Sequence, residues 1–327
     1  MTGAGSPLAD PGWSAWQTLP LRVPPAPAVL AETLDGGQAF RWRNDDGIWS
    51  GVFGENIVRL TYGPRDGDAA PPPRSGDSAT RASRLHGQVR WSAPAALAAT
   101  TGPAFAHYFD AARDPHELAD ALPWRSDPHL AVCLAAFLGL RILRQPFGET
   151  LLCFLCSATK QIVQIKQMLA LLAARHGTPL LSDSSLVTRY SSLPTWSELA
   201  SIPEAELRAC QFGFRARFIH QTACFLAAHP GWLETTAQAP YAEAKERLCS
   251  LPGVGEKIAD CVLLFGAGRL EAFPVDTWIL QAMAARYGLH GWKPAQVAQF
   301  GRAHFGSLAG LAQQYLFSWE RSHGDKR

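Results

Sequence analysis

Leu251-Pro-Gly-Val-Gly-Glu-Lys257 places two glycines between two stretches of helical periodicity, which we predict as helices over 241–250 and 256–265. Gly253 and Gly255 permit a tight turn whose backbone N–H groups converge, and the positive end of the second helix adds to that anion site. Such a turn holds a phosphodiester without reading bases. We therefore predict a helix-hairpin-helix that binds a nucleic-acid backbone through Gly253 and Gly255.

Lys257 and Asp276 add reactive groups to this turn. Lys257 lies in the first turn of the second predicted helix, where the helix dipole and burial both favour the neutral amine, the nucleophilic form. Asp276 follows Pro274 at the expected start of another helix, so its carboxylate can cap backbone N–H groups and stay ionised near the lysine. A hairpin alone is equally typical of a structural turn or a non-catalytic DNA grip. The two side chains together predict catalysis, with Lys257 as nucleophile and Asp276 as its charged partner.

The composition is that of a globular chain without a clear charge signature. Its 327 residues, 47% of them hydrophobic, can bury a sizeable core in two or three subdomains. A net charge of +2 does not indicate a nucleic-acid partner. The longest apolar stretch, 131–140, is too short to span a bilayer, and the N-terminus shows no secretory signal. We expect no membrane partner and an intracellular location: cytoplasm and nucleoid in a bacterium, nucleus in a eukaryote.

The seven cysteines have no regular spacing and lie mostly in apolar helical context, as buried thiols do in a reducing compartment. Cys153 and Cys156 form a C-x-x-C, but the turn that a metal or redox site needs is missing, so we predict that both pack in the core. No cysteine follows Cys261, which excludes a C-terminal cysteine-ligated iron–sulfur cluster. We expect neither a metal nor a cofactor.

The N-terminal part of the chain alternates short β patterns with turns. Strands are predicted at 39–43, 48–53 and 57–61, and a further strand at 88–91. The segment 62–85 is rich in Pro, Gly, Asp and Ser, which is typical of a flexible loop. An antiparallel sheet is the expected product.

The pattern changes to the helical period near residue 104, and about eight short helices are predicted to follow. Ser201-Ile-Pro-Glu204 resembles a capping box that opens one of them. The predicted fold class is α+β, an N-terminal antiparallel β-sheet domain packed on a mainly α-helical domain. Its expected parts are an N-terminal tail (1–24), the sheet domain (25–125), the helical domain (126–320, with the hairpin at 241–266) and a C-terminal tail (321–327).

The hairpin, taken with Pro274-Val-Asp276, resembles the helix-hairpin-helix (HhH-GPD) DNA glycosylase superfamily. The fuller string 251–261 is similar to the 8-oxoguanine DNA glycosylase family, and the resemblance extends from about Ala31 to Trp319. Members of that family are bifunctional. The resemblance implies an N-glycosylase that flips oxidised purine out of DNA, excises it through a lysine Schiff base and nicks the abasic strand by β-elimination.

The resemblance also assigns base-binding residues. Gly36-Gly-Gln-Ala-Phe-Arg-Trp42 matches the family's G-Q-x-F-R-W segment, which makes Gly37 the residue whose carbonyl senses the N7 hydrogen of the oxidised base. Gln313 takes the Watson–Crick edge, and a flipped purine lies between Cys261 and Phe317. The i, i+4 spacing of Gln313 and Phe317 puts both on one helix face, as this arrangement requires. In isolation each residue is more typical of an ordinary core or surface position.

Other residues are assigned to DNA contacts around the flipped nucleotide. Phe212-Gly-Phe-Arg-Ala-Arg217 is similar to the family's wedge segment, in which an aromatic residue fills the helix beside the extruded nucleotide. Phe214 is the predicted wedge, and Arg208 and Arg215 are predicted near the orphaned base or its phosphates.

The chain departs from the family in the run that begins at Cys156. Thr159 and Lys160 replace asparagines that fill the gap left by the flipped base, and Gln164 replaces the arginine that reads the opposite cytosine. Because a glutamine both donates and accepts hydrogen bonds, we expect a relaxed preference for cytosine opposite the lesion. Trp278 stands where the family has a phosphate-contacting histidine.

Two other functions stay open at this point. A glycosylase for alkylated purines or mismatches would share the hairpin and Asp276, but monofunctional relatives need only an activated water, so Lys257 and Gly37 argue against it. A non-catalytic damage-binding module would keep the hairpin without needing the lysine and aspartate. We expect the partner to be double-stranded DNA with an oxidised purine, and the protein to act as a monomer.

Overall fold

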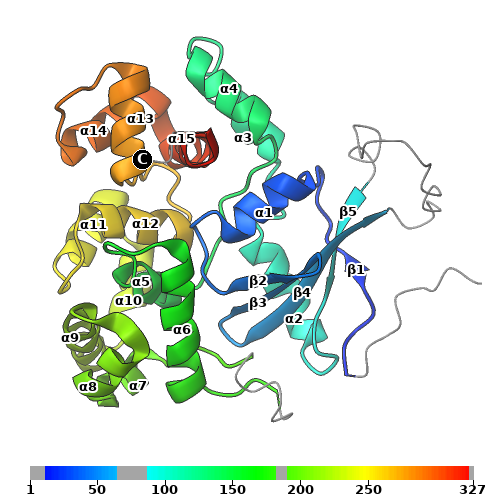
Figure 1. Ribbon diagram of the computed structural model, residues 1–327, viewed down its shortest axis with the longest axis vertical. Helices are drawn as coiled ribbons and strands as arrows, with labels where there is room; N and C mark the ends of the chain where they lie inside the picture. The colour runs from blue at the N-terminus through cyan, green and yellow to red at the C-terminus, as the bar shows by residue number, and fades with distance from the viewer. Residues whose placement is uncertain (1–11, 65–86, 182–189, 324–327) are drawn as a thin grey trace, which may run out of the picture.

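The predicted β patterns form one antiparallel sheet. In the computed structural model, which describes residues 12–64, 87–181 and 190–323, the strand order is β1-β5-β4-β3-β2 (Figure 1). The strands are β1 (Gln17–Thr18), β2 (Trp42–Asp45), β3 (Ile48–Phe53), β4 (Asn56–Pro64) and β5 (Gly87–Ser92). The sheet is confirmed.

The edges of the predicted loop and tail need correction. Residues 62–64 continue β4, because they pair with β5 where a loop was predicted. The rest of that loop, from 65 onward, lies outside the described residues, as do residues 1–11 of the predicted N-terminal tail. Within that tail, β1 pairs with β5 and forms an edge of the sheet.

Trp42 ties the sheet to the helix beneath it. It pairs with Gly51 of β3, where an added Cβ would lie 2.5 Å from the indole, so the ring can cross the neighbouring strand only over a glycine. Its Nε1 donates to Tyr108 Oη at 2.9 Å, at the end of α2 (Ala98–Tyr108). A further helix that the sequence pattern did not reveal, α1 (Pro27–Asp35), contributes Leu30 to the same core.

The described residues contain thirteen more α-helices, most of which lie to the left of the sheet in Figure 1, while α3 and α4 lie above it. The number exceeds the eight predicted, because short helices such as α8 (Glu204–Leu207) have too few turns to show a periodic pattern of apolar residues. They are α3 (Pro115–Asp120), α4 (Pro128–Ala136), α5 (Phe147–Leu155), α6 (Ile162–His176), α7 (Trp196–Ser201), α8 (Glu204–Leu207), α9 (Arg215–Ala228), α10 (Trp232–Gln238), α11 (Tyr241–Cys249), α12 (Glu256–Gly266), α13 (Thr277–Tyr287), α14 (Pro294–Phe305) and α15 (Ala309–His323).

Two details of the helical prediction were wrong. The predicted capping box at 201–204 is absent, because α7 ends at Ser201 and Pro203 occupies the N-cap of α8; the box instead joins Thr195 to Glu198 at the start of α7. The helix α15 continues through 321–323, which the sequence placed in the C-terminal tail. Residues 324–327 lie outside the described residues.

The helical half has its own apolar core, and Cys153 and Cys156 are buried in it, which confirms the core-packing prediction for this C-x-x-C. All seven cysteines are free. None of the helices in the described part of the chain is long and apolar enough to cross a bilayer.

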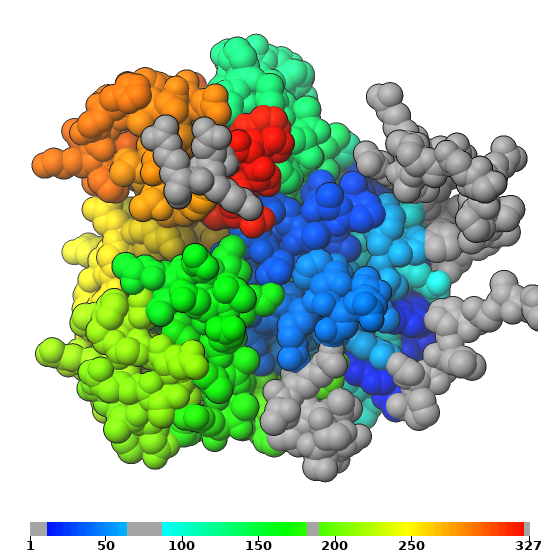
Figure 2. Space-filling view, viewed as in Figure 1, coloured from blue at the N-terminus to red at the C-terminus, as the bar shows by residue number. Residues whose placement is uncertain are grey.

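Gln38 connects the two halves. Its side chain is fully buried, donating to Arg141 O and accepting from Leu143 N, both at 2.9 Å. Gln145 Nε2 in turn donates to Gln38 O at 2.6 Å. The segment 36–40 is therefore fixed against 141–145, the strip of chain that enters the helical half. Figure 2 shows the two halves in contact along a seam between α6 and the β2–β3 region.

Candidate active site

The hairpin forms as predicted, with α11 and α12 joined at residues 250–255. Gly253 has a φ of +77°, and an added Cβ would lie 2.7 Å from the Phe218 ring, so this position requires glycine. Gly255 is the N-cap of α12 with an ordinary φ of −96°, and a Cβ there would meet nothing within 4 Å. The turn therefore depends on Gly253, while Gly255 leaves the helix N-terminus open to an approaching backbone.

Lys257 lies in the first turn of α12, partly buried, as the sequence predicted. Its Nζ donates to Ser157 Oγ at 3.3 Å and lies 5.2 Å from the centre of the Phe154 ring. Both neighbours come from the end of α5 and the residues after it. The amine is thereby directed at the junction of α5 and α12 rather than into bulk water.

Asp276 is the N-cap of α13, and its carboxylate accepts a hydrogen bond from Ile279 N at 2.8 Å. The capping role that the sequence predicted is confirmed. Burial raises the pKa of this carboxyl above its ordinary range, while the Ile279 N–H and the charge of Lys257 oppose that rise. A desolvated carboxylate of this kind interacts strongly with a nearby positive charge.

Six predicted site residues meet in one place. A cavity of about 40 Å³ is lined by both catalytic candidates and all four base-binding candidates, together with four residues that the sequence did not single out: Gly37, Phe154, Lys257, Cys261, Phe265, Pro274, Asp276, Gln313, Gln314 and Phe317. Its volume is far below the roughly 150 Å³ that accommodates a benzene ring. The side chains must move apart before a purine can enter.

Gly37 and Phe317 face each other across the pocket. Gly37 has a φ of +105°, and a Cβ there would lie 3.1 Å from Ile162 Cδ1 and 3.6 Å from Phe317 Cε1. The absence of a side chain lets the backbone approach the pocket. Gln313, one turn before Phe317 on α15, is 5% exposed, and its Oε1 has no hydrogen-bond partner in the described residues. A buried amide oxygen without a partner is costly and is suited to a ligand that donates to it.

Cys261 follows Lys257 by one turn of α12 and is buried. Burial raises the pKa of its thiol to about 12, although the charge of Lys257 opposes the rise. The residue therefore presents a neutral, polarizable thiol to the pocket, which suits contact with a planar base rather than nucleophilic attack.

The sequence did not predict two of the aromatic residues that line the pocket. Phe154 of α5 and Phe265 of α12 stack with ring centres 5.6 Å apart and planes 13° apart. Phe40 meets Phe154 edge to face at 5.4 Å. Apolar residues at helical spacing predict core positions, and these three rings do lie in the core. Phe154 comes close to Lys257 because α5 packs on α12, which the sequence pattern does not reveal.

The predicted DNA-contact residues differ in exposure and in the partners they already have. Phe214 is 53% exposed just before α9, as a wedge must be. Gln164 is exposed in the first turn of α6, where its Oε1 accepts from Gln161 N at 3.2 Å. Lys160 is partly buried in the preceding turn, and exposed Arg208 pairs with Glu204 at 2.9 Å. Their contacts with DNA stay predictions.

Arg215 lies against the turn at 158–159. Its side chain is 3% exposed, and its guanidinium donates to Ala158 O and, at 2.8 Å, to Thr159 Oγ1. Thr159 is exposed and has a φ of +55°, a conformation that is costly for a β-branched residue, so the two hydrogen bonds from Arg215 stabilise this turn. The contact of Arg215 with the orphaned base or its phosphates stays a prediction.

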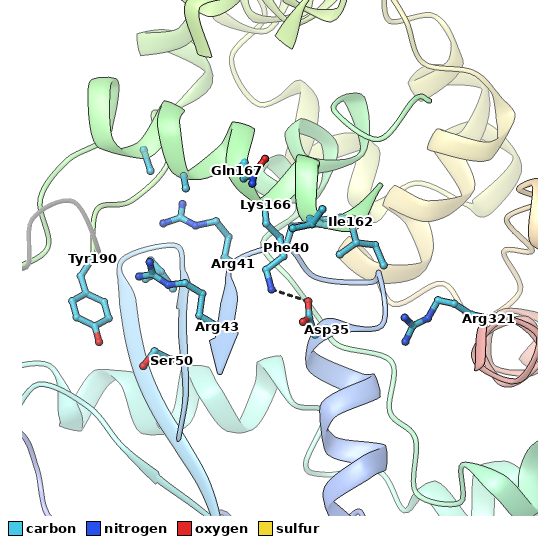
Figure 3. A pocket seen from close by; sticks show the side chains of 14 residues that line it. Asp35, Phe40, Arg41, Arg43, Ser50, Ile162, Lys166, Gln167, Tyr190 and Arg321 are labelled. Atoms are coloured by element: carbon cyan, nitrogen blue, oxygen red, sulfur yellow. Dashed lines mark hydrogen bonds and ion pairs between the residues drawn. The ribbon is translucent and has the colours of Figure 1, made fainter. Parts of the chain in front are cut away.

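A larger cavity lies elsewhere. It measures about 430 Å³ and lies between α6 and the sheet, lined by cationic and apolar side chains (Figure 3). Two of its cations form ion pairs: Lys166 pairs with Asp35 at 2.8 Å, and Arg321 pairs with Glu32. Neither Lys257 nor Asp276 lines this cavity, and Ile162, which does, also approaches Gly37.

Comparison with known proteins agrees with this geometry. Residues 20–151 match the 8-oxoguanine DNA glycosylase N-terminal domain, and residues 153–303 match the HhH-GPD superfamily base excision DNA repair protein. The N-glycosylase/DNA lyase OGG1 of Arabidopsis thaliana is 30% identical over 319 residues, which cover 91% of this chain and 79% of that protein.

Solved structures give the same result. The Clostridium acetobutylicum 8-oxoguanine glycosylase/lyase, bound to double-stranded DNA with cytosine opposite 8-oxoguanine, is 30% identical with a TM-score of 0.75, covering 90% of this chain and 91% of that one. The Archaeoglobus fulgidus 3-methyladenine DNA glycosylase shares the fold alone, with 18% identity and a TM-score of 0.68. The match covers 95% of this chain and 99% of that one. The chain belongs to the 8-oxoguanine DNA glycosylase family of the HhH-GPD superfamily.

Proposed function

We propose that this protein is a bifunctional base-excision repair enzyme that removes 8-oxoguanine from double-stranded DNA and then cleaves the strand. The observation that carries the proposal is the single pocket at the start of α12. It combines an amine, a partly buried carboxylate, a backbone at Gly37 and an amide oxygen at Gln313 that has no hydrogen-bond partner in the described residues. A phosphate-binding hairpin lies directly beside it.

The chemistry follows from the side chains. The neutral amine of Lys257 attacks C1′ of the flipped nucleotide, the glycosidic bond breaks, and the base leaves with its bonding electrons and takes up a proton. The sugar ring then opens: the nitrogen lone pair forms the C1′=N bond, the C1′–O4′ bond breaks, and O4′ takes up a proton. The nitrogen keeps its remaining hydrogen, which gives an iminium. Loss of a C2′ proton then expels the 3′ phosphate and nicks the strand, and water releases the lysine. Asp276 stabilises the positive charge that develops on the sugar.

The alternatives fit the pocket less well. An alkylated-purine or mismatch glycosylase has no use for an amine that contacts the base cavity, and a damage-binding module has no use for a desolvated carboxylate beside it. Lys257 and Asp276 both line the cavity, which favours covalent chemistry over either alternative.

Borohydride trapping tests the proposal, because it reduces the iminium and links enzyme to DNA. We expect an adduct with duplexes that hold 8-oxoguanine, and loss of the adduct in Lys257→Gln. If wild type forms no adduct opposite any of the four bases, the bifunctional assignment is wrong. An adduct that persists in Lys257→Gln but disappears in Asp276→Asn would place the nucleophile elsewhere.

The same assay measures which base the enzyme prefers opposite the lesion. Gln164 Oε1 accepts from Gln161 N at 3.2 Å, but an amide oxygen has two lone pairs, so the exposed side chain can still both donate to and accept from an opposite base, whereas arginine only donates. We therefore propose a weaker preference for cytosine than an arginine would give. The trapping yield opposite adenine, guanine and thymine, relative to cytosine, measures it directly.

We further propose a monomeric enzyme in a reducing compartment, cytoplasm and nucleoid in a bacterium or nucleus in a eukaryote. The seven free cysteines, of which five are buried, support the reducing compartment. Light scattering of the purified protein and imaging of a tagged chain in its own cell test the two statements.

A further inference from the structure

Ser157 lies next to the lysine amine. It is the second residue after α5, partly buried, and its Oγ is 3.3 Å from Lys257 Nζ. The contact joins residues 100 positions apart in the chain. Ser157 is thus placed to influence the group that performs the proposed attack.

The direction of this hydrogen bond is fixed by a second one. Ser157 Oγ donates to Phe154 O at 2.7 Å, and Ser157 N donates to the same carbonyl at 3.0 Å. A hydroxyl has one proton, so with that proton engaged Oγ can only accept from Lys257. One lysine N–H therefore points at Ser157.

The other neighbours of Lys257 hold the amine less firmly than the serine does. The Asp276 carboxylate accepts from Ile279 N at 2.8 Å, and the Cys261 side chain, which also hydrogen-bonds Lys257, is a neutral thiol and therefore a weak hydrogen-bonding group. The Phe154 ring attracts a cation through its face but does not fix rotation about the Cε–Nζ bond.

We propose that Ser157 is a positioning residue for the Schiff-base lysine. With one N–H held by Ser157 Oγ, the lone pair of the neutral amine occupies one of the two remaining staggered positions and never points at the serine. This restriction raises the fraction of amines aligned with C1′. The inference rests on the proposed function, since it assumes that Lys257 is the nucleophile.

Single-turnover excision with enzyme in excess tests it. We expect Ser157→Ala to slow 8-oxoguanine release and borohydride adduct formation together by roughly 10- to 100-fold. The dissociation constant for the lesion duplex should change by less than about threefold, since the serine acts on the amine and not on DNA affinity. Ser157→Thr keeps the hydroxyl and should restore most of the rate.

Ser126→Ala is the matched control. Ser126 Oγ also donates to the carbonyl three residues earlier, that of Pro123 at 3.1 Å, on an exposed turn away from the pocket. Its excision rate should equal that of wild type. Should Ser157→Ala fail to fold, Ser157→Cys is nearly the same size but offers a poor acceptor, and the same slowing is expected.

A wild-type rate in Ser157→Ala overturns the inference, and so does a slowing that matches a loss of DNA affinity and is not rescued by threonine, because that pattern describes a structural role. If wild type itself forms no adduct, the proposed function fails first. A normal wild-type adduct with an unchanged Ser157→Ala rate removes only the role of Ser157.

Discussion

Asp276 illustrates how one residue serves both the fold and the chemistry. Its carboxylate caps α13 through Ile279 N and lines the base pocket beside Lys257. An asparagine caps a helix about as well as an aspartate, whereas only the aspartate carries the charge. The two tasks can therefore be separated by a single substitution.

We expect Asp276→Asn to lower the single-turnover excision rate by roughly 10²- to 10³-fold, because the developing positive charge loses its partner. The free energy of unfolding should stay within about 1 kcal/mol of wild type, because the cap is retained. Urea unfolding and excision assays on the same preparation check both parts. A fall in stability as large as that for Asp276→Ala would show that the asparagine does not cap.

The pH dependence follows from the raised pKa of Asp276. The carboxyl protonates at a higher pH than a free aspartate, whose pKa is about 3.9, so the acid limb of the excision rate should lie above that value. The effect on stability has the opposite sign. Because the pKa of Asp276 is higher in the folded than in the unfolded state, the ionised carboxylate lowers the free energy of unfolding above the folded pKa, and this loss disappears as pH falls through that pKa. The part of the acid limb that protonation of Asp276 causes should be missing from the residual rate of Asp276→Asn.

At the scale of elements, the hairpin shows which features a local pattern can carry. Its two helices form within a residue of the predicted bounds, since Pro240, the Pro-Gly turn and the apolar face of α12 all act locally. The pattern did not distinguish the two glycines. Only the packing of Phe218 from α9 against the turn makes Gly253 indispensable.

The two glycines form a matched pair for a test. Gly253→Ala should reduce the free energy of unfolding by about 1–3 kcal/mol and weaken DNA binding, since it combines a left-handed φ with a clash against the Phe218 ring. Gly255→Ala should cost less than about 1 kcal/mol, because its φ is ordinary and its Cβ meets no atom. Equal losses of stability in the two variants would contradict this account.

At the scale of the whole molecule, the base pocket exists because the sheet half delivers Gly37 to the helical half. Gln38 makes this attachment through two hydrogen bonds to the 141–143 backbone. The bonds are fully buried, so the energetic cost of losing them is high. The lesion sensing that we propose for Gly37 thus depends on the interface between the two halves and not on a loop alone.

Gln38→Leu should lower the free energy of unfolding by about 2–5 kcal/mol, because it leaves two buried backbone groups unpaired. It should also slow 8-oxoguanine excision more than nicking at a preformed abasic site, which has no base for Gly37 to contact. Gln167→Leu, on the exposed face of α6, is the control and should affect neither. If Gln38→Leu slowed 8-oxoguanine excision and abasic-site nicking equally, Gln38 would have no role in base recognition.

The sequence by itself determined two kinds of feature: elements that depend on neighbouring residues, and site residues that match the motifs of a known family. The hairpin, the N-cap at Asp276 and the alternating strands follow from turn chemistry and periodicity. The family resemblance supplied the base-binding residues, and all four line one pocket with Lys257 and Asp276.

The tertiary structure alone decided which groups meet across long separations. The Arg215 side chain is buried and donates to Thr159 Oγ1, 56 residues away, an acceptor that only the fold brings to it. Ser157 and Lys257 are 100 residues apart, and Gln38 bonds residues more than 100 positions away. Such contacts depend on how α5, α12 and the sheet pack, and no local pattern encodes that packing.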